Sequence, residues 1–112
     1  MLNQIILVGR LTKDLELKEG ENESKYTIMN LAIPRSFKNS EGQYDTDFIN
    51  CIAFDSIASN TAEYCKKGDI IGVKGRVQTR IIEKNDNKEY IMEIIAEKVT
   101  FLSSKSNNES TD

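Results

Sequence analysis

The fold expected for this chain is decided by residues 47–82, which read DFINCIAFDSIASNTAEYCKKGDIIGVKGRVQTRII. The segment begins and ends with stretches in which apolar side chains alternate with others, Asp47–Phe54 and Asp69–Ile82. A period of two residues is typical of β strands that bury one face. Between these stretches the apolar and small side chains from Ile57 to Cys65 recur at the spacing of an amphipathic helix. The segment therefore predicts strand, helix and strand in that order.

The predicted helix has signals at both ends. Asp55 or Ser56 is expected to cap its amino end through a side-chain oxygen. Lys66 and Lys67 suit the negative carboxyl end of a helix dipole. Gly68 follows them and is expected to take the left-handed conformation that stops a helix. We therefore expect the helix to end at this glycine.

Two further strands are expected before this segment and one after it. Gln4–Leu11 (QIILVGRL) and Lys25–Ile33 (KYTIMNLAI) are rich in branched aliphatic side chains. Glu89–Leu102 is expected to pair with Asp69–Ile82 across a turn at Asn85–Asn87. The resulting order is three strands, one helix and two strands. This order predicts an all-β protein with one short helix, a five-stranded Greek-key OB-fold barrel in which the helix plugs one end.

The remaining segments read as connections. Asp14–Ser24 is an irregular acidic stretch, and Phe37–Asp47 is a polar loop or the tip of a long hairpin. Pro34 has no backbone donor, so it is expected to end the second strand or to place it at an edge. With 112 residues in all, the chain predicts one OB-fold domain over residues 1–102 and a disordered polar tail over residues 103–112.

Composition excludes several classes of function. The chain has no histidine and two cysteines, so zinc sites of the usual type and histidine-based catalytic groups cannot be built within it. Cys51 and Cys65 are expected to be buried free thiols. The glycines match neither phosphate-binding pattern, and no apolar run is long enough for a membrane span or a signal peptide. We expect a cytoplasmic, non-enzymatic binding module without metal, cofactor or membrane contact.

Charge is distributed unevenly along the chain. The formal net charge is −3, but five acids and one lysine in Asp14–Glu23 account for −4, and Ser103–Asp112 accounts for −1. The remaining body therefore carries +2, since −3 − (−4) − (−1) = +2. A mildly basic body with an acidic loop and tail is compatible with a polyanionic partner such as nucleic acid.

One predicted strand carries a stripe of cations. Within Asp69–Ile82, alternation places Lys74, Arg76 and Arg80 on the face opposite the apolar residues. The stripe is about 20 Å long at the rise of a β strand. It fits either a solvated outer face or a groove that follows a phosphate backbone.

Aromatic residues favour the second interpretation. If Ile49, Cys51 and Ala53 face the core, then Phe48 and Phe54 face outward. Exposing that much aromatic surface is unfavourable without a partner. Phe37 is a third candidate, although any one of these rings could instead belong to the core. Aromatic rings beside a basic strand stack unpaired bases, whereas no helix here is basic and long enough for a DNA major groove.

These segments resemble bacterial and phage single-stranded DNA-binding proteins. The similarity is carried by NQIILVGRLTKD, DFINCIAF, EYCKKGD and GVKGRVQTR followed by a hairpin, in the order and spacing of that family from about Met1 to Leu102. The resemblance implies an OB fold, usually a homotetramer, and binding of single-stranded DNA without sequence specificity during replication, recombination and repair. It implies no catalytic activity. The apolar strand Gln4–Leu11 also predicts an edge that a second subunit covers.

The same resemblance implies the nucleic-acid-binding residues. Stacking positions match Phe37, Phe48 and Phe54, where many members carry tryptophan at some of them, and a fourth stacking position matches Ile82, which is not aromatic. The basic positions expected to contact the DNA backbone are Arg10, Arg35, Lys67, Lys74, Arg76 and Arg80.

The end of the chain departs from the family pattern. Cellular members carry a long linker and an acidic, aromatic-tipped terminus that recruits other replication and repair proteins, whereas this sequence stops at SNNESTD. We therefore expect no recruitment through such a tip, and both a shortened chain and a phage or mobile-element origin stay open. The alternative function is an OB-fold accessory module that binds RNA or a replication-restart protein.

Overall fold

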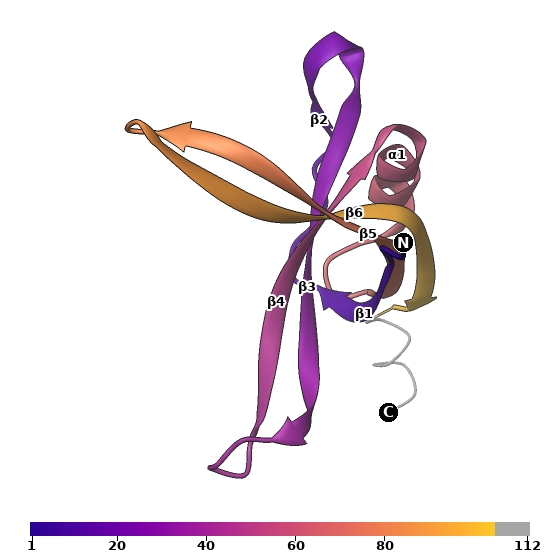
Figure 1. The fold of residues 1–112 in the computed structure, drawn as a ribbon. Helices are drawn as coiled ribbons and strands as arrows, with labels where there is room; N and C mark the ends of the chain where they lie inside the picture. Colours follow the sequence, from indigo (N-terminus) through magenta and orange to yellow (C-terminus); the bar gives the residue numbers. More distant parts are fainter. Residues whose placement is uncertain (105–112) are drawn as a thin grey trace.

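A computed structural model describes residues 1–104 and shows a barrel with a long projecting arm (Figure 1). Its strands run in the order β1-β5-β6-β4-β3-β2, and an additional pairing of β1 with β3 closes the first five into a barrel. The five-stranded OB-fold barrel expected from the sequence is thus confirmed. The elements are β1 (Ile5–Leu11), β2 (Lys18–Glu19), a 3-10 turn (Glu21–Glu23), β3 (Lys25–Lys38), β4 (Tyr44–Phe54), α1 (Asp55–Tyr64), β5 (Ile70–Lys84) and β6 (Asn87–Ser103).

The core is formed by the inward-facing side chains of the strands. Met29 and Leu31 on β3, Cys51 on β4, and Ile71 and Val73 on β5 are almost completely buried, as their alternation predicts. The helix α1 packs against β3, β4 and β6. Both cysteines are buried free thiols, as expected, and burial raises the pKa of the Cys51 thiol to about 11. A thiol with such a pKa is almost entirely protonated at neutral pH and does not act as a nucleophile.

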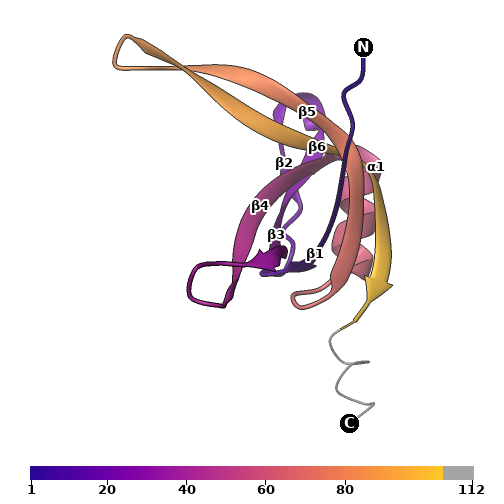
Figure 2. The ribbon, with the colours of Figure 1, turned by 60° about the horizontal axis from the view of Figure 1, so that its bottom comes forward.

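A bulge interrupts the pairing of β5 with β6 within the barrel. Between Lys74 and Gly75 the pairing of β5 with β6 shifts by one residue, which leaves Glu97 as the extra residue of β6. A side chain at Gly75 would overlap the carbonyl oxygen of Ile95, so only glycine fits where the strands approach this closely. Val77 and Ile94 still belong to the barrel, where Ile94 pairs with Cys51 of β4, and farther along β5 and β6 leave the barrel together and form the arm (Figures 1 and 2).

The arm ends in a two-residue turn. Asn85 and Asp86 have φ angles of 53° and 65°, the conformation of the type I′ turn that matches the twist of a hairpin. Asn and Asp tolerate left-handed backbone because their short polar side chains bond locally. The predicted turn is in the correct place, although Asn87 already belongs to β6.

The helix differs from its prediction at both ends. It ends at Tyr64, four residues before Gly68, because Cys65 takes an extended conformation and turns the chain back toward β5. Gly68 does have a left-handed φ of 95°, but it lies in the turn before β5, where its N–H donates to the carbonyl of Leu11 at 2.8 Å. Phe54 occupies the N-cap position without a side-chain cap bond, whereas the Asp55 carboxylate accepts a hydrogen bond from the Lys25 N–H at 3.3 Å.

Several predicted connections are more regular than expected. β3 continues past Pro34, which pairs with Thr46, and the register shifts only after the proline. The polar segment that follows is therefore a long ribbon of β3 and β4 with a short tip (Figure 1). The acidic connection contains β2 and a 3-10 turn. β6 reaches Ser103, so the predicted tail boundary lies too early, and the rest of that predicted tail from residue 105 on lies outside the described residues.

Candidate nucleic-acid interface

The outward sides of β3 and β4 form one continuous face. Four cross-strand pairs follow one another along it, Tyr26 with Phe54, Ile28 with Ile52, Asn30 with Asn50 and Ala32 with Phe48. Paired residues in an antiparallel ladder point to the same side of the sheet, so all eight side chains share this surface, which we call the outer face.

Two phenylalanines on β4 mark the two ends of the outer face. Phe48 is 66% exposed and Phe54 is 43% exposed, so both rings point away from the core, as the alternation predicts. Tyr26 packs beside Phe54 with ring centroids 6.5 Å apart and planes tilted by 45°. This tilted contact packs Tyr26 against Phe54, which still leaves 43% of Phe54 exposed. Sequence reasoning missed Tyr26, since its alignment with Phe54 depends on the β3–β4 register.

The other predicted stacking positions lie farther away. Phe37 is 64% exposed and lies near the end of β3, on the projecting β3–β4 ribbon. Ile82 lies on the arm opposite Glu89 and is half-buried. Among the exposed aromatic residues that were not predicted as stacking positions are Tyr44, whose ring lies 5.8 Å from the Lys38 ammonium nitrogen, and Tyr90 on the arm.

Three of the predicted backbone-contacting arginines are already paired with carboxylates. Arg76 Nη1 lies 3.5 Å from Glu97 Oε2, and Arg80 Nη2 lies 3.3 Å from Glu93 Oε2. The Glu93 side chain is 13% exposed, so its pair is the most buried of them. Arg35 forms the third pair, with Asp47. A phosphate that approaches these arginines must therefore compete with a protein carboxylate.

The Arg35 pair is bidentate. Arg35 Nε donates to Asp47 Oδ2 and Arg35 Nη2 donates to Asp47 Oδ1, both at 3.0 Å, while Asp45 Oδ2 lies 4.0 Å from Arg35 Nη1. The hydrogen bond to Asp47 raises the pKa of Arg35, and the same bond lowers the pKa of Asp47. Two parallel hydrogen bonds of this kind resemble those that an arginine makes to a phosphate.

The remaining predicted cations lie at different places. Arg10 pairs with Ala32 in the barrel and so lies next to the outer face, where its Nη1 donates to the Gly68 carbonyl at 2.7 Å. Lys67 is exposed in the turn after α1. Lys74 is exposed on β5, between β1 and β6, and does not belong to the outer face.

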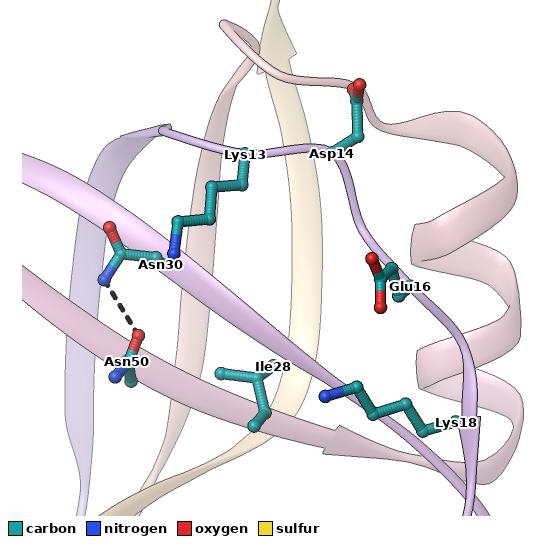
Figure 3. A pocket seen from close by; sticks show the side chains of 7 residues that line it. All are labelled: Lys13, Asp14, Glu16, Lys18, Ile28, Asn30 and Asn50. Atoms are coloured by element: carbon teal, nitrogen blue, oxygen red, sulfur yellow. Dashed lines mark hydrogen bonds between the residues drawn. The ribbon is translucent and has the colours of Figure 1, made fainter.

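A polar hollow of about 320 Å³ opens between the outer face and the segment that follows β1 (Figure 3). Lys13 points toward Asn30, and Lys18 points toward Ile28. Sequence reasoning missed this site, because its members come from three separate segments. Its lining residues are Lys13, Asp14, Glu16, Lys18, Ile28, Asn30 and Asn50.

An apolar hollow of about 210 Å³ adjoins it and shares Ile28 and Asn50 with it. This second hollow lies between β4 and the base of the arm. Its other lining residues are Ile52, Ile91, Met92 and Glu93. Lysines and amides on one side and aliphatic side chains on the other give the outer face both polar and apolar recesses between its two phenylalanines.

Within residues 1–104 no helix has the length and apolar character needed to cross a membrane. The barrel topology defines an OB-fold protein, and its two outward phenylalanine rings lie on the outer face of β3 and β4. The family model described as "Single-strand binding protein family" matches residues 2–102. The chain belongs to this family.

Individual relatives and one solved structure agree with this assignment. Single-stranded DNA-binding protein 3 of Listeria innocua is 48% identical over 108 residues, which cover 96% of this chain and 68% of the relative. Single-stranded DNA-binding protein B of Bacillus subtilis is 41% identical over 113 residues, and the alignment covers 100% of this chain and 100% of the relative. The structure of a deletion mutant of the Thermus aquaticus single-stranded DNA-binding protein has a TM-score of 0.78 and 25% identity, covering 94% of this chain and 52% of that chain.

Proposed function

We propose that this chain binds single-stranded DNA without sequence specificity and coats it during replication, recombination and repair. The observation that carries the proposal is the pair of outward rings, Phe48 and Phe54, on one face of a family member's barrel. Every base has a π face, so rings of this kind hold bases of any sequence. The family and its bacterial relatives support a role without catalysis and a place of action in the bacterial cytoplasm or nucleoid.

Two arginines add to this interface by leaving their carboxylate partners and binding DNA phosphates. Arg35 lies beyond the Phe48 end of the outer face and pairs with Asp47 on the other side of the β3–β4 ribbon, and Arg80 lies on the arm beside the apolar hollow. Both are exposed enough to turn from their carboxylates toward a phosphate. Because each such contact displaces a protein carboxylate, the electrostatic part of binding is modest, and stacking supplies a large share.

We also propose that the protein assembles with copies of itself, as a homotetramer. In the described part of the chain, Ile5–Gly9 of β1 pair with β5 on one side only, because the pairing of β1 with β3 is confined to Arg10 and Leu11. The unpaired edge carries Ile6 and Val8, which are both exposed. An open apolar edge is stabilised by pairing with a second subunit.

The proposed DNA binding is tested by titrating labelled oligo-dT with the purified chain, with duplex DNA and RNA of the same length as competitors. We expect saturable binding to oligo-dT, weak competition by the duplex and a negative dependence of log affinity on log salt concentration. Failure to bind oligo-dT would contradict the proposal. Stronger competition by RNA, or retention of a protein partner in its place, would favour the accessory-module alternative.

A further inference from the structure

The two exposed phenylalanines on β4 are too far apart for neighbouring bases. Phe48 and Phe54 are six residues apart on one strand, which is about 20 Å at the rise of a β strand. Bases stacked in a duplex are separated by roughly 3.4 Å along the strand. A DNA strand that contacts both rings therefore has nucleotides that cross the cross-strand pairs between them, Ile28 with Ile52 and Asn30 with Asn50.

The surface at this crossing is hollowed on both sides of Asn50. The polar hollow brings the ammonium groups of Lys13 and Lys18 to one side, and the apolar hollow offers Ile52 and Ile91 on the other. Of the polar hollow's two acids, Asp14 is engaged elsewhere, because its Oδ1 accepts the Lys67 N–H at 2.9 Å. A nucleotide consists of a charged phosphate and a flat base. The polar hollow with its two lysines suits the phosphate, and the apolar hollow suits the base.

A chain of hydrogen bonds fixes the orientation of the Asn50 amide. The Thr12 hydroxyl donates to Asn30 Oδ1 at 2.6 Å, and Asn30 Nδ2 then donates to Asn50 Oδ1 at 2.8 Å. Because its oxygen accepts this bond (Figure 3), Asn50 has its Nδ2 donor directed away from Asn30, and the residue lines both hollows. Each of the four bases carries an acceptor on its edges, so one donor suits any of them.

We propose that these two hollows form a nucleotide subsite between the stacking rings. The base lies in the apolar hollow against Ile52 and Ile91, Asn50 Nδ2 donates to an acceptor on its edge, and Lys18 and Lys13 contact the phosphate in the polar hollow. The Glu16 carboxylate lines the polar hollow and opposes the phosphate. The inference rests on the proposed function, since it assigns a place to one nucleotide of the bound strand.

Charge variants with a matched control test the phosphate contact. Lys18 and Lys25 are both exposed on the β2–β3 hairpin, but Lys18 pairs with Tyr26 and Lys25 with Glu19, so their side chains point to opposite faces. In titrations of labelled oligo-dT at several salt concentrations, we expect Lys18→Gln to weaken binding and to make the log-log salt slope less negative by about 0.7. Lys25→Gln should leave both unchanged, and Glu16→Gln should strengthen binding.

An uncharged variant tests the base contact. Asn50→Leu removes the donor and should weaken oligo-dT binding by roughly 2- to 10-fold, the range of one hydrogen bond, with the salt slope unchanged. Gln43→Leu, an amide lost from the tip of the β3–β4 ribbon, serves as the control. Asn50 is exposed, so a thermal midpoint close to that of the unmodified chain verifies that the variant is folded.

The outcomes separate the subsite from the function it rests on. If the unmodified chain does not bind oligo-dT, the proposed function fails. If it binds and Phe54→Ala weakens binding, but Lys18→Gln matches Lys25→Gln or Asn50→Leu matches Gln43→Leu, the subsite is overturned and the proposed function stands.

Discussion

Arg35 and Asp47 are joined by two parallel hydrogen bonds of 3.0 Å across the β3–β4 ribbon, on the side of the ribbon opposite to the exposed ring of Phe48, the next residue of β4. This geometry gives the carboxylate the place that a phosphate takes in an arginine–phosphate pair. The pair therefore holds the guanidinium in an orientation suited to binding while opposing the entry of a DNA phosphate.

Removing the carboxylate charge should strengthen DNA binding. We expect Asp47→Asn to increase oligo-dT affinity and to make the salt slope more negative by about 0.7, because Arg35 becomes free to contact one more phosphate. Titrations at several salt concentrations measure both quantities. In the Arg35→Gln variant, Asp47→Asn should leave the salt slope unchanged. An equal gain in oligo-dT affinity in that variant would show that the effect comes from the lower net negative charge and not from Arg35.

The stability contribution of this pair should depend on pH in a defined direction. The pKa of Asp47 lies below its ordinary value of 3.8 because Arg35 hydrogen-bonds its ionised form. A carboxyl group with a lowered folded-state pKa contributes stability above the unfolded pKa and loses it as pH falls through the folded pKa. Thermal midpoints of the unmodified chain and Asp47→Asn should therefore differ slightly at pH 7 and converge below pH 3.8. A constant difference across this range would contradict the assignment.

Truncation of the outward rings should reduce binding more than stability. We expect Phe48→Ala and Phe54→Ala to weaken oligo-dT binding by roughly 1 to 3 kcal/mol each, the range for one base–aromatic stack. A buried phenylalanine would instead cost about 3 to 5 kcal/mol of stability. Phe101→Ala removes a half-exposed ring of β6 that lies outside the outer face and serves as the control. Lost stability with unchanged affinity of the folded variants would show that these rings do not stack on DNA.

The orientation of these rings could be predicted from sequence because strand alternation is a local property. Buried Cys51 and Ala53 alternate with more exposed residues, so the pattern can be recognised in a single stretch of eight residues. The Thr12–Asn30–Asn50 chain could not be predicted, since its members are separated by 18 and 20 positions and meet only through the barrel register.

The ion pairs and the end of the helix could not be predicted from the sequence, because both depend on how distant segments pack together. The Arg76–Glu97 pair depends on a bulge that the apolar pattern does not reveal. The helix ends at Tyr64, where Cys65 becomes extended, and Gly68 serves the later turn before β5, in which its N–H donates to the Leu11 carbonyl. Gly68 is thus a residue that often ends a helix, but its presence in the sequence does not show which turn of the backbone it forms.

An aromatic residue on the arm should add a stacking site on one face only. We expect Ile82→Tyr to strengthen oligo-dT binding without changing the salt slope, because stacking neutralises no phosphate. Ile82 is half-buried on the face that carries Arg80, whereas the adjacent Ile81 is exposed on the opposite face beside Tyr90. Ile81→Tyr is therefore the matched control, and equal gains from both variants would indicate a non-specific aromatic effect.

The open edge of β1 should direct self-association. Because Ile5–Gly9 lack a second strand partner within the described residues, a subunit pairing there would cover Ile6 and Val8. Analytical ultracentrifugation should give a mass near four times the 12.7 kDa of one chain. Val8→Asp places a charge on that edge and should shift the distribution toward smaller species, whereas Met92→Asp, an equally apolar-to-acidic change on the arm, should leave the mass unchanged. A mass of one chain at all concentrations would refute the tetramer, and an unchanged mass of Val8→Asp would place the subunit contact elsewhere on the barrel.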